Sequence, residues 1–227
     1  MTSLILASLA FMLVHLVPVT ALRPWLLKKI GEKAYLALFS LVSLALLVLM
    51  ARAYGDTQAA APLWVAGMAL DVIIAFLMLI AFWLLVAANT ERNPAAVGGG
   101  AVLEQSAVPH GVFTITRHPL MVGIALWAIL HLIANPDLAS LVLFGSLTIT
   151  AIAGSLAQDL RKEREIGVAW RRYRSHTSFM PFLAVLEGRT RLDAGDVTWW
   201  RVALATALWL IFLAGHGAIF GVPALDL

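Results

Sequence analysis

Long apolar segments dominate this 227-residue chain and restrict what it can fold into. A membrane-spanning α-helix needs about 20 consecutive apolar residues, and six segments approach or exceed that length. They cover residues 4–22, 34–51, 63–88, 119–134, 138–157 and 200–222. With 61% hydrophobic and 13% charged residues, the chain has more apolar surface than a water-soluble fold of this size can hide. The sequence therefore predicts one all-α, multi-pass membrane domain over residues 1–227.

The basic residues lie almost entirely on one side of these six segments. All of the 16 Lys and Arg residues except Arg52 fall within residues 23–33, 89–118 and 158–201. Cytoplasmic loops of membrane proteins are enriched in Lys and Arg, so these three segments should share the cytoplasmic side. They do so only with six transmembrane helices and both termini on the outer side. The pattern predicts an inner (cytoplasmic) membrane protein with long cytosolic loops.

Local signals mark two helix starts and one flexible loop. Pro119 suits the first position of a helix, and Asn135-Pro136-Asp137 suits a tight turn followed by a helix. Gly98-Gly99-Gly100 predicts a flexible stretch between the third and fourth spans. Arginines alternate with Trp170 and Tyr173, which is typical of an interfacial helix on anionic lipid. No nucleic-acid-binding motif accompanies this charge, so we expect membrane lipid and no nucleic acid as a partner.

Ionisable side chains inside the predicted spans are few, and such residues are costly to place in a bilayer. They are His15, Asp71, His131 and His216, with His118 at the cytoplasmic threshold. The chain has no cysteine, so disulfides, iron–sulfur clusters and thiolate ligands are excluded. Two histidines on facing helices can hold a haem iron from both sides, and haem suits an apolar bundle.

The predicted depths leave two histidine pairs open. His15 and His131 differ in depth by about 10 Å, counting 1.5 Å of rise for each helical residue. Helix tilt can close part of that difference. His131 and His216 lie at similar predicted depths. The residues alone therefore do not choose between the two pairs.

Two blocks of sequence resemble the NnrU family, which includes the zeta-carotene cis-trans isomerases of plants and cyanobacteria. The first is Phe11–Pro18 followed by Arg23, and the second runs from Arg117-His118-Pro119 to Asn135. In the isomerase branch, the resemblance implies haem b with His15 and His131 as metal ligands. Arg117 and His118 are further candidates for cofactor binding.

The resemblance also implies a function. One implication is haem-dependent cis-trans isomerisation of a carotenoid-like apolar substrate. The other is a link to nitrite and nitric oxide metabolism in denitrification. A non-catalytic membrane assembly factor is a separate hypothesis.

A wider resemblance connects the chain to isoprenylcysteine carboxyl methyltransferases and phospholipid methyltransferases. The residues that carry it are His110, Arg117, His118, Pro119, Gly123, Glu163 and Tyr173. It implies a cytosolic pocket for S-adenosylmethionine and methyl transfer to a lipid or a prenylated substrate. The sequence departs from that pattern, because Leu120 or Met121 replaces a tyrosine and Arg164 separates Glu163 from Glu165.

Overall fold

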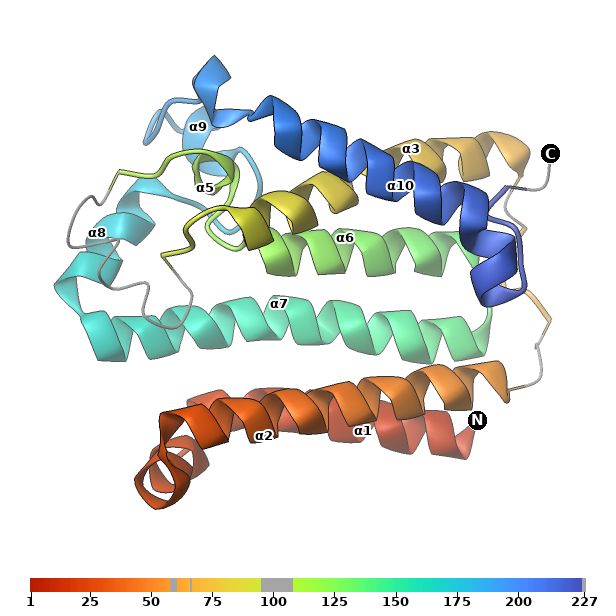
Figure 1. Ribbon diagram of the computed structural model, residues 1–227, viewed down its shortest axis with the longest axis horizontal. Coiled ribbons are helices and arrows are strands. Elements are labelled where there is room, and N and C mark those ends of the chain that lie inside the picture. The colour runs from red at the N-terminus through yellow and green to blue at the C-terminus, as the bar shows by residue number, and fades with distance from the viewer. Residues whose placement is uncertain (58–60, 66, 95–107, 226–227) are drawn as a thin grey trace.

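The computed structural model describes residues 1–57, 61–65, 67–94 and 108–225, and these parts contain helices and no strand. The predicted flexible stretch Gly98-Gly99-Gly100 lies outside them. The elements are α1 (Thr2–Leu16), η1 (Val17–Val19), α2 (Leu22–Gly55), α3 (Met68–Thr90), α5 (Val112–Ile115), α6 (Pro119–Ala134), α7 (Leu138–Ile166), α8 (Val168–His176), α9 (Leu183–Leu186), η2 (Ala194–Asp196) and α10 (Trp199–Phe220). The long helices lie side by side along one axis, which confirms the all-α fold (Figure 1).

Five helical segments are long and apolar enough to cross a membrane: Thr2–Val19, Leu22–Gly55, Met68–Thr90, Leu138–Ile166 and Trp199–Phe220. The fourth predicted span, α6, is apolar but has only 16 residues, or about 24 Å of helix. The hydrocarbon core of a bilayer is about 30 Å thick. Length and composition thus support a multi-pass membrane protein.

The outer surface of the bundle carries large apolar side chains, as expected for contact with lipid. Leu13, Leu41 and Phe76 are each more than 60% exposed on three different long helices. A water-soluble protein rarely leaves apolar side chains exposed in such numbers. The surplus of apolar residues in the sequence is therefore placed on the outside of the bundle.

Helix α7 lies at the centre of the arrangement. It packs between α6 on one side and the α1–α2 pair on the other, while α3 and α10 cover the far side of α6 (Figure 1). The main core cluster joins Leu4 and Phe11 of α1 to Leu143 and Phe144 of α7. This order matters for the site, because a helix separates side chains on α1 from those on α6.

Both predicted helix starts are found in the structure, at the first residues of α6 and α7. Pro119 occupies the first turn of α6. Asp137 caps α7, because its side chain accepts a hydrogen bond from the Ser140 backbone N–H at 2.9 Å. Helix α2 begins earlier than predicted and is interrupted at Gly31, whose φ of 78° favours glycine. The apolar span predicted from residue 34 thus starts just after that break.

The two ends of the bundle differ in build. The short elements α5, α8 and α9 gather at one end, which we call the capped end (Figure 1). The turn between α6 and α7 lies at the opposite end, which we call the turn end (Figure 1). At the capped end, the Arg117 N–H donates to the Ser178 carbonyl and the Phe182 N–H donates to the Ile115 carbonyl, each at 2.9 Å. These bonds hold the cap against the start of α6.

Candidate functional site

The three histidines predicted within the spans share one hydrogen-bonding arrangement. The Nδ1 atom of each ring lies at a backbone carbonyl: His15 at Phe11, His131 at Trp127 and His216 at Val222, at 2.8, 3.0 and 2.7 Å. A carbonyl oxygen can only accept, so Nδ1 carries a proton, and in the neutral imidazole Nε2 then keeps its lone pair. Metal-binding histidines are commonly fixed in this way.

The structure does not bring His15 and His131 together. His15 lies in the last turn of α1 at the capped end, and its ring contacts Phe11 and Phe39, with centroid distances of 4.2 and 5.4 Å. His131 lies in the last turn of α6 at the turn end. The two rings therefore have separate sets of neighbours.

His131 is instead placed beside His216. The two ring centroids are 6.5 Å apart, with 24° between the ring planes. Trp127 and Phe144 also contact the His131 ring, with centroid distances of 4.3 and 5.0 Å. Of the two pairs that the predicted depths left open, the fold places His131 and His216 close together.

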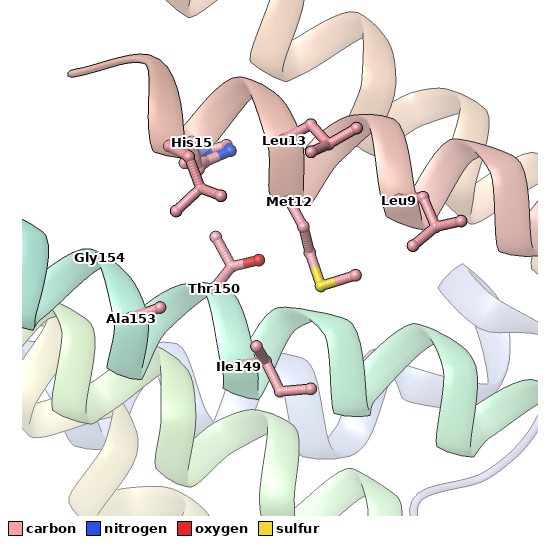
Figure 2. Close-up of a pocket in the computed structure, with 9 residues that line it drawn as sticks. Leu9, Met12, Leu13, His15, Ile149, Thr150, Ala153 and Gly154 are labelled. Carbon is pink, nitrogen blue, oxygen red and sulfur yellow. The ribbon is translucent and has the colours of Figure 1, made fainter. Parts of the chain in front are cut away.

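His15 lines a pocket between α1 and α7 (Figure 2). The cavity is about 280 Å³, and its lining residues are Leu9, Met12, Leu13, His15, Leu16, Ile149, Thr150, Ala153 and Gly154. Met12 and Thr150 reach into the gap from the two facing helices (Figure 2). The Thr150 hydroxyl donates to the Ser146 carbonyl at 2.7 Å, so it is already satisfied. The lining suits an apolar ligand.

Arg117 and His118 meet a shared partner at the capped end. Arg117 Nε donates to both Asp159 carboxylate oxygens at 3.0 and 3.1 Å, and His118 Nε2 lies 2.9 Å from Asp159 Oδ1. All three residues are buried. The sequence analysis did not assign Asp159 to this site. The available signal was that Asp159 is the first charged residue after the apolar run 138–157.

Three further residues of the methyltransferase-like pattern, His110, Glu163 and Tyr173, also lie at the capped end. Glu163 pairs with Arg174 at 2.8 Å, and His110 lies 3.5 Å from Glu91. Tyr173 is almost completely buried, and its hydroxyl has no hydrogen-bond partner among the described residues. Burial raises the pKa of this hydroxyl, so it stays neutral. Glu163 and His110 are thus already paired with other side chains of the protein.

The donor set limits which metal centres this chain can hold. Among the described residues, no group of three or more His, Asp or Glu side chains is placed to bind a metal ion. A haem needs at most two ligands from the protein, because the porphyrin supplies the others. A pair of imidazoles in an apolar bundle therefore fits a haem better than it fits a bare ion that needs four protein ligands.

Comparison with known proteins gives the family. The profile of the NnrU protein family matches residues 3–224. The chain is 28% identical to "15-cis-zeta-carotene isomerase, chloroplastic" of Zea mays over 196 residues, which are 83% of this chain and 52% of that protein. It is 36% identical to the Arabidopsis thaliana protein of the same name over 81 residues, which are 35% of this chain and 22% of that protein.

The chain thus spans at most about half the length of these two relatives. No solved structure matches it. The family match, in contrast, covers nearly the whole chain and every long helix of the bundle. This chain belongs to the NnrU family.

Proposed function

We propose that this chain is an isomerase-related membrane protein that binds haem b and acts on an extended apolar molecule of the carotenoid class. One observation carries the proposal. Three histidines within a cysteine-free apolar bundle each hold Nδ1 at a carbonyl and keep the Nε2 lone pair available. Family membership and the similarity to two plant isomerases support the choice of reaction class.

His131 is the residue common to both candidate ligand pairs. The family resemblance pairs it with His15, and the packing pairs it with His216. When bound, haem would supply an iron centre that interacts with a conjugated π-system and lowers the barrier to rotation about a double bond. The protein would hold the iron through Nε2 atoms and keep each ring oriented through its bond to a carbonyl. Arg117 and His118 lie about a helix length from His131, at the other end of α6.

The pocket between α1 and α7 lies on the other side of α7 from His131, and it is the proposed docking site for the apolar molecule rather than the place of the reaction. Its walls are almost entirely aliphatic, and it opens between two helices that carry lipid-exposed side chains. An apolar ligand dissolved in the bilayer would reach it from the side without crossing water. The walls would then exclude water and limit how the ligand lies along α7.

The orientation of the chain belongs to the same proposal. With α6 as a sixth, short span, both termini lie on the outer side and the capped end faces the cytosol of a cell with an inner membrane. The distribution of Lys and Arg supports this arrangement. A link to nitrite and nitric oxide metabolism, methyl transfer from S-adenosylmethionine and a non-catalytic assembly role stay predictions.

An absorption spectrum tests the proposed function. The full chain is expressed with a supply of haem, purified in detergent and scanned in the oxidised and reduced states. We expect a Soret band. When a cis-polyene is added, we expect its conversion to the trans isomer, which is measured by chromatography. A protein free of haem under these conditions would contradict the proposal.

Filling the pocket is expected to reduce use of the apolar substrate. In Ala153→Phe, a large ring occupies a cavity of about 280 Å³, so we expect at least about a ten-fold loss of polyene binding or conversion with haem content unchanged. The matched control is Ile152→Phe, because the neighbouring Ile152 is exposed and does not line the pocket. Equal activity in the two variants would argue against this pocket as the binding site.

A further inference from the structure

We infer that Arg23 and Tyr35 of α2 and Arg161 of α7 form a binding site for the phosphate group of an anionic phospholipid. The site lies at the capped end of the bundle, where the first part of α2 meets the last turns of α7 (Figure 1). The inference goes beyond the proposed function and does not depend on it, because it assigns a ligand to residues that the proposed function does not use.

The break in α2 at Gly31 allows these residues to meet. Gly31 has a φ of 78° and a ψ of 166°, so the helix changes direction between Arg23 and Tyr35. Arg23 Nη1 donates to Glu165 Oε1 at 2.8 Å, which ties the first part of α2 to the end of α7. The positive charges of Arg23 and Arg161 both act on the Tyr35 hydroxyl. Two parts of α2 and the end of α7 thus contribute to one cluster.

Two buried donor atoms of this cluster have no hydrogen-bond partner. Tyr35 is only 5% exposed, and its hydroxyl makes no hydrogen bond among the described residues. Arg23 Nε is also buried without a partner there, because the bond to Glu165 uses Nη1. Buried polar groups are nearly always hydrogen-bonded. Two unpaired donors in one cluster therefore indicate an acceptor that binds between α2 and α7.

The charge of the cluster indicates that this acceptor is an anion. Arg161 lies within electrostatic range of Arg23, Tyr35 and Glu165, so within the described part of the chain two guanidinium groups share one carboxylate. Glu165 is bound to Arg23, and Arg161 forms no ion pair with any described residue. Guanidinium groups bind phosphate oxygens through parallel hydrogen bonds. A phosphate has enough oxygens to accept from both arginines and from the tyrosine.

The depth of the cluster favours a lipid as the source of the phosphate. The apolar run of α2 starts just after Gly31, so Tyr35 lies in the first turns of that run. Trp25 is 55% exposed on the first part of α2, and tryptophan is enriched where lipid headgroups meet the hydrocarbon core. Leu38 and Leu41 are exposed further along α2 and offer apolar surface to acyl chains. A phosphate held at this depth therefore belongs to a phospholipid.

This site differs in kind from the basic surface of α8. Arg171 and Arg172 are exposed there, and exposed charges attract anionic headgroups without fixing one binding position. At the α2–α7 site, in contrast, one donor is the buried hydroxyl of Tyr35. Removing that hydroxyl leaves the net charge unchanged and therefore tests a defined site rather than a general attraction.

Thermal unfolding in the presence of defined lipids tests the site. The full chain is purified in detergent with its native lipids removed, and the apparent Tm is measured with added dioleoylphosphatidylglycerol or dioleoylphosphatidylcholine. We expect the anionic lipid to raise the Tm of the parent protein and the zwitterionic lipid to leave it unchanged. Tyr35→Phe and Arg161→Gln should each weaken binding of phosphatidylglycerol by at least about ten-fold, the scale of one hydrogen bond to a charged group.

Two controls separate lipid binding from folding. Arg164→Gln makes the same change as Arg161→Gln at an exposed position of the same helix, and it should keep the full response to phosphatidylglycerol. Tyr35→Phe keeps the ring that stacks on Phe39, so its Tm without lipid should not fall below that of the parent protein. A fall there would show that the hydroxyl is bound within the protein and would overturn the site.

The remaining outcomes identify the source of the anion. An equal response to phosphatidylglycerol in Tyr35→Phe and the parent protein would overturn the site. Stabilisation by inorganic phosphate equal to that by phosphatidylglycerol would overturn the assignment to a lipid. Haem content is measured in parallel, and its loss in Tyr35→Phe would assign the cluster to the carboxylates of haem instead. A parent protein without haem that still responds to phosphatidylglycerol would contradict the proposed function and support this site.

Discussion

Replacing His131 by alanine is expected to weaken haem binding by at least about 10–100-fold. Loss of an outer-shell partner of a metal ligand commonly lowers metal affinity by that factor, and loss of the ligand itself should lower it no less. His131 belongs to both candidate pairs, so the expected loss does not depend on which second histidine is used. The measurement is the Soret absorbance per mole of purified protein across a haem titration. Activity toward a polyene is expected to fall in parallel.

The control for this variant is His110→Ala, which removes a mainly exposed imidazole at the capped end, far from His131. It should keep the spectrum of the parent protein. Adding free imidazole to His131→Ala should restore part of the low-spin signal, because a small ligand can enter the space that the side chain leaves. Full haem occupancy in His131→Ala, with an unchanged spectrum, would refute the role of His131 as a ligand.

Replacing Asp159 by asparagine is expected to destabilise the fold strongly. The substitution removes the negative charge that Arg117 and His118 share in a buried site. Removing one partner of a buried ion pair costs about 3–5 kcal/mol, because the remaining charge is left without compensation. For a chain of this size the apparent Tm should fall by roughly 10 °C, as measured by thermal unfolding in detergent.

The matched control is Glu32→Gln, which makes the same change from carboxylate to amide at an exposed position of α2. It should leave the apparent Tm within about a degree of that of the parent protein, since exposed charges contribute little. Haem content at low temperature should survive in Asp159→Asn, because Asp159 lies far along α7 from Phe144, which packs on His131. A Tm unchanged by the substitution would show that the Arg117–Asp159–His118 contacts do not stabilise the fold.

Much of the fold follows from local sequence signals. The apolar runs predict the long helices, Pro119 marks the start of α6, and Asp137 marks the cap of α7. These features depend on a few neighbouring residues, so they can be read without knowledge of the packing. The predicted helix ends were less accurate. Helix α2 begins, and helix α7 ends, in charged segments that a hydropathy pattern does not include.

The candidate site depends on contacts between residues that are distant in sequence. Asp159 binds Arg117 across 42 positions, and His216 approaches His131 across a longer interval. Predicted depths placed His131 and His216 at similar levels but could not say that α10 carries one ring to the other. The pocket beside His15 was not predicted either, because it depends on how closely α1 and α7 approach each other.

The amino-acid sequence by itself determined that this chain forms apolar helices suited to a membrane, because hydrophobicity and helix length are properties of contiguous residues. It also determined which few side chains inside those helices could bind a metal. Only the tertiary structure decided that His216 rather than His15 lies beside His131, and that Asp159 holds Arg117 and His118. The physical reason is that helix order and rotation arise from packing around α7, which no single segment encodes.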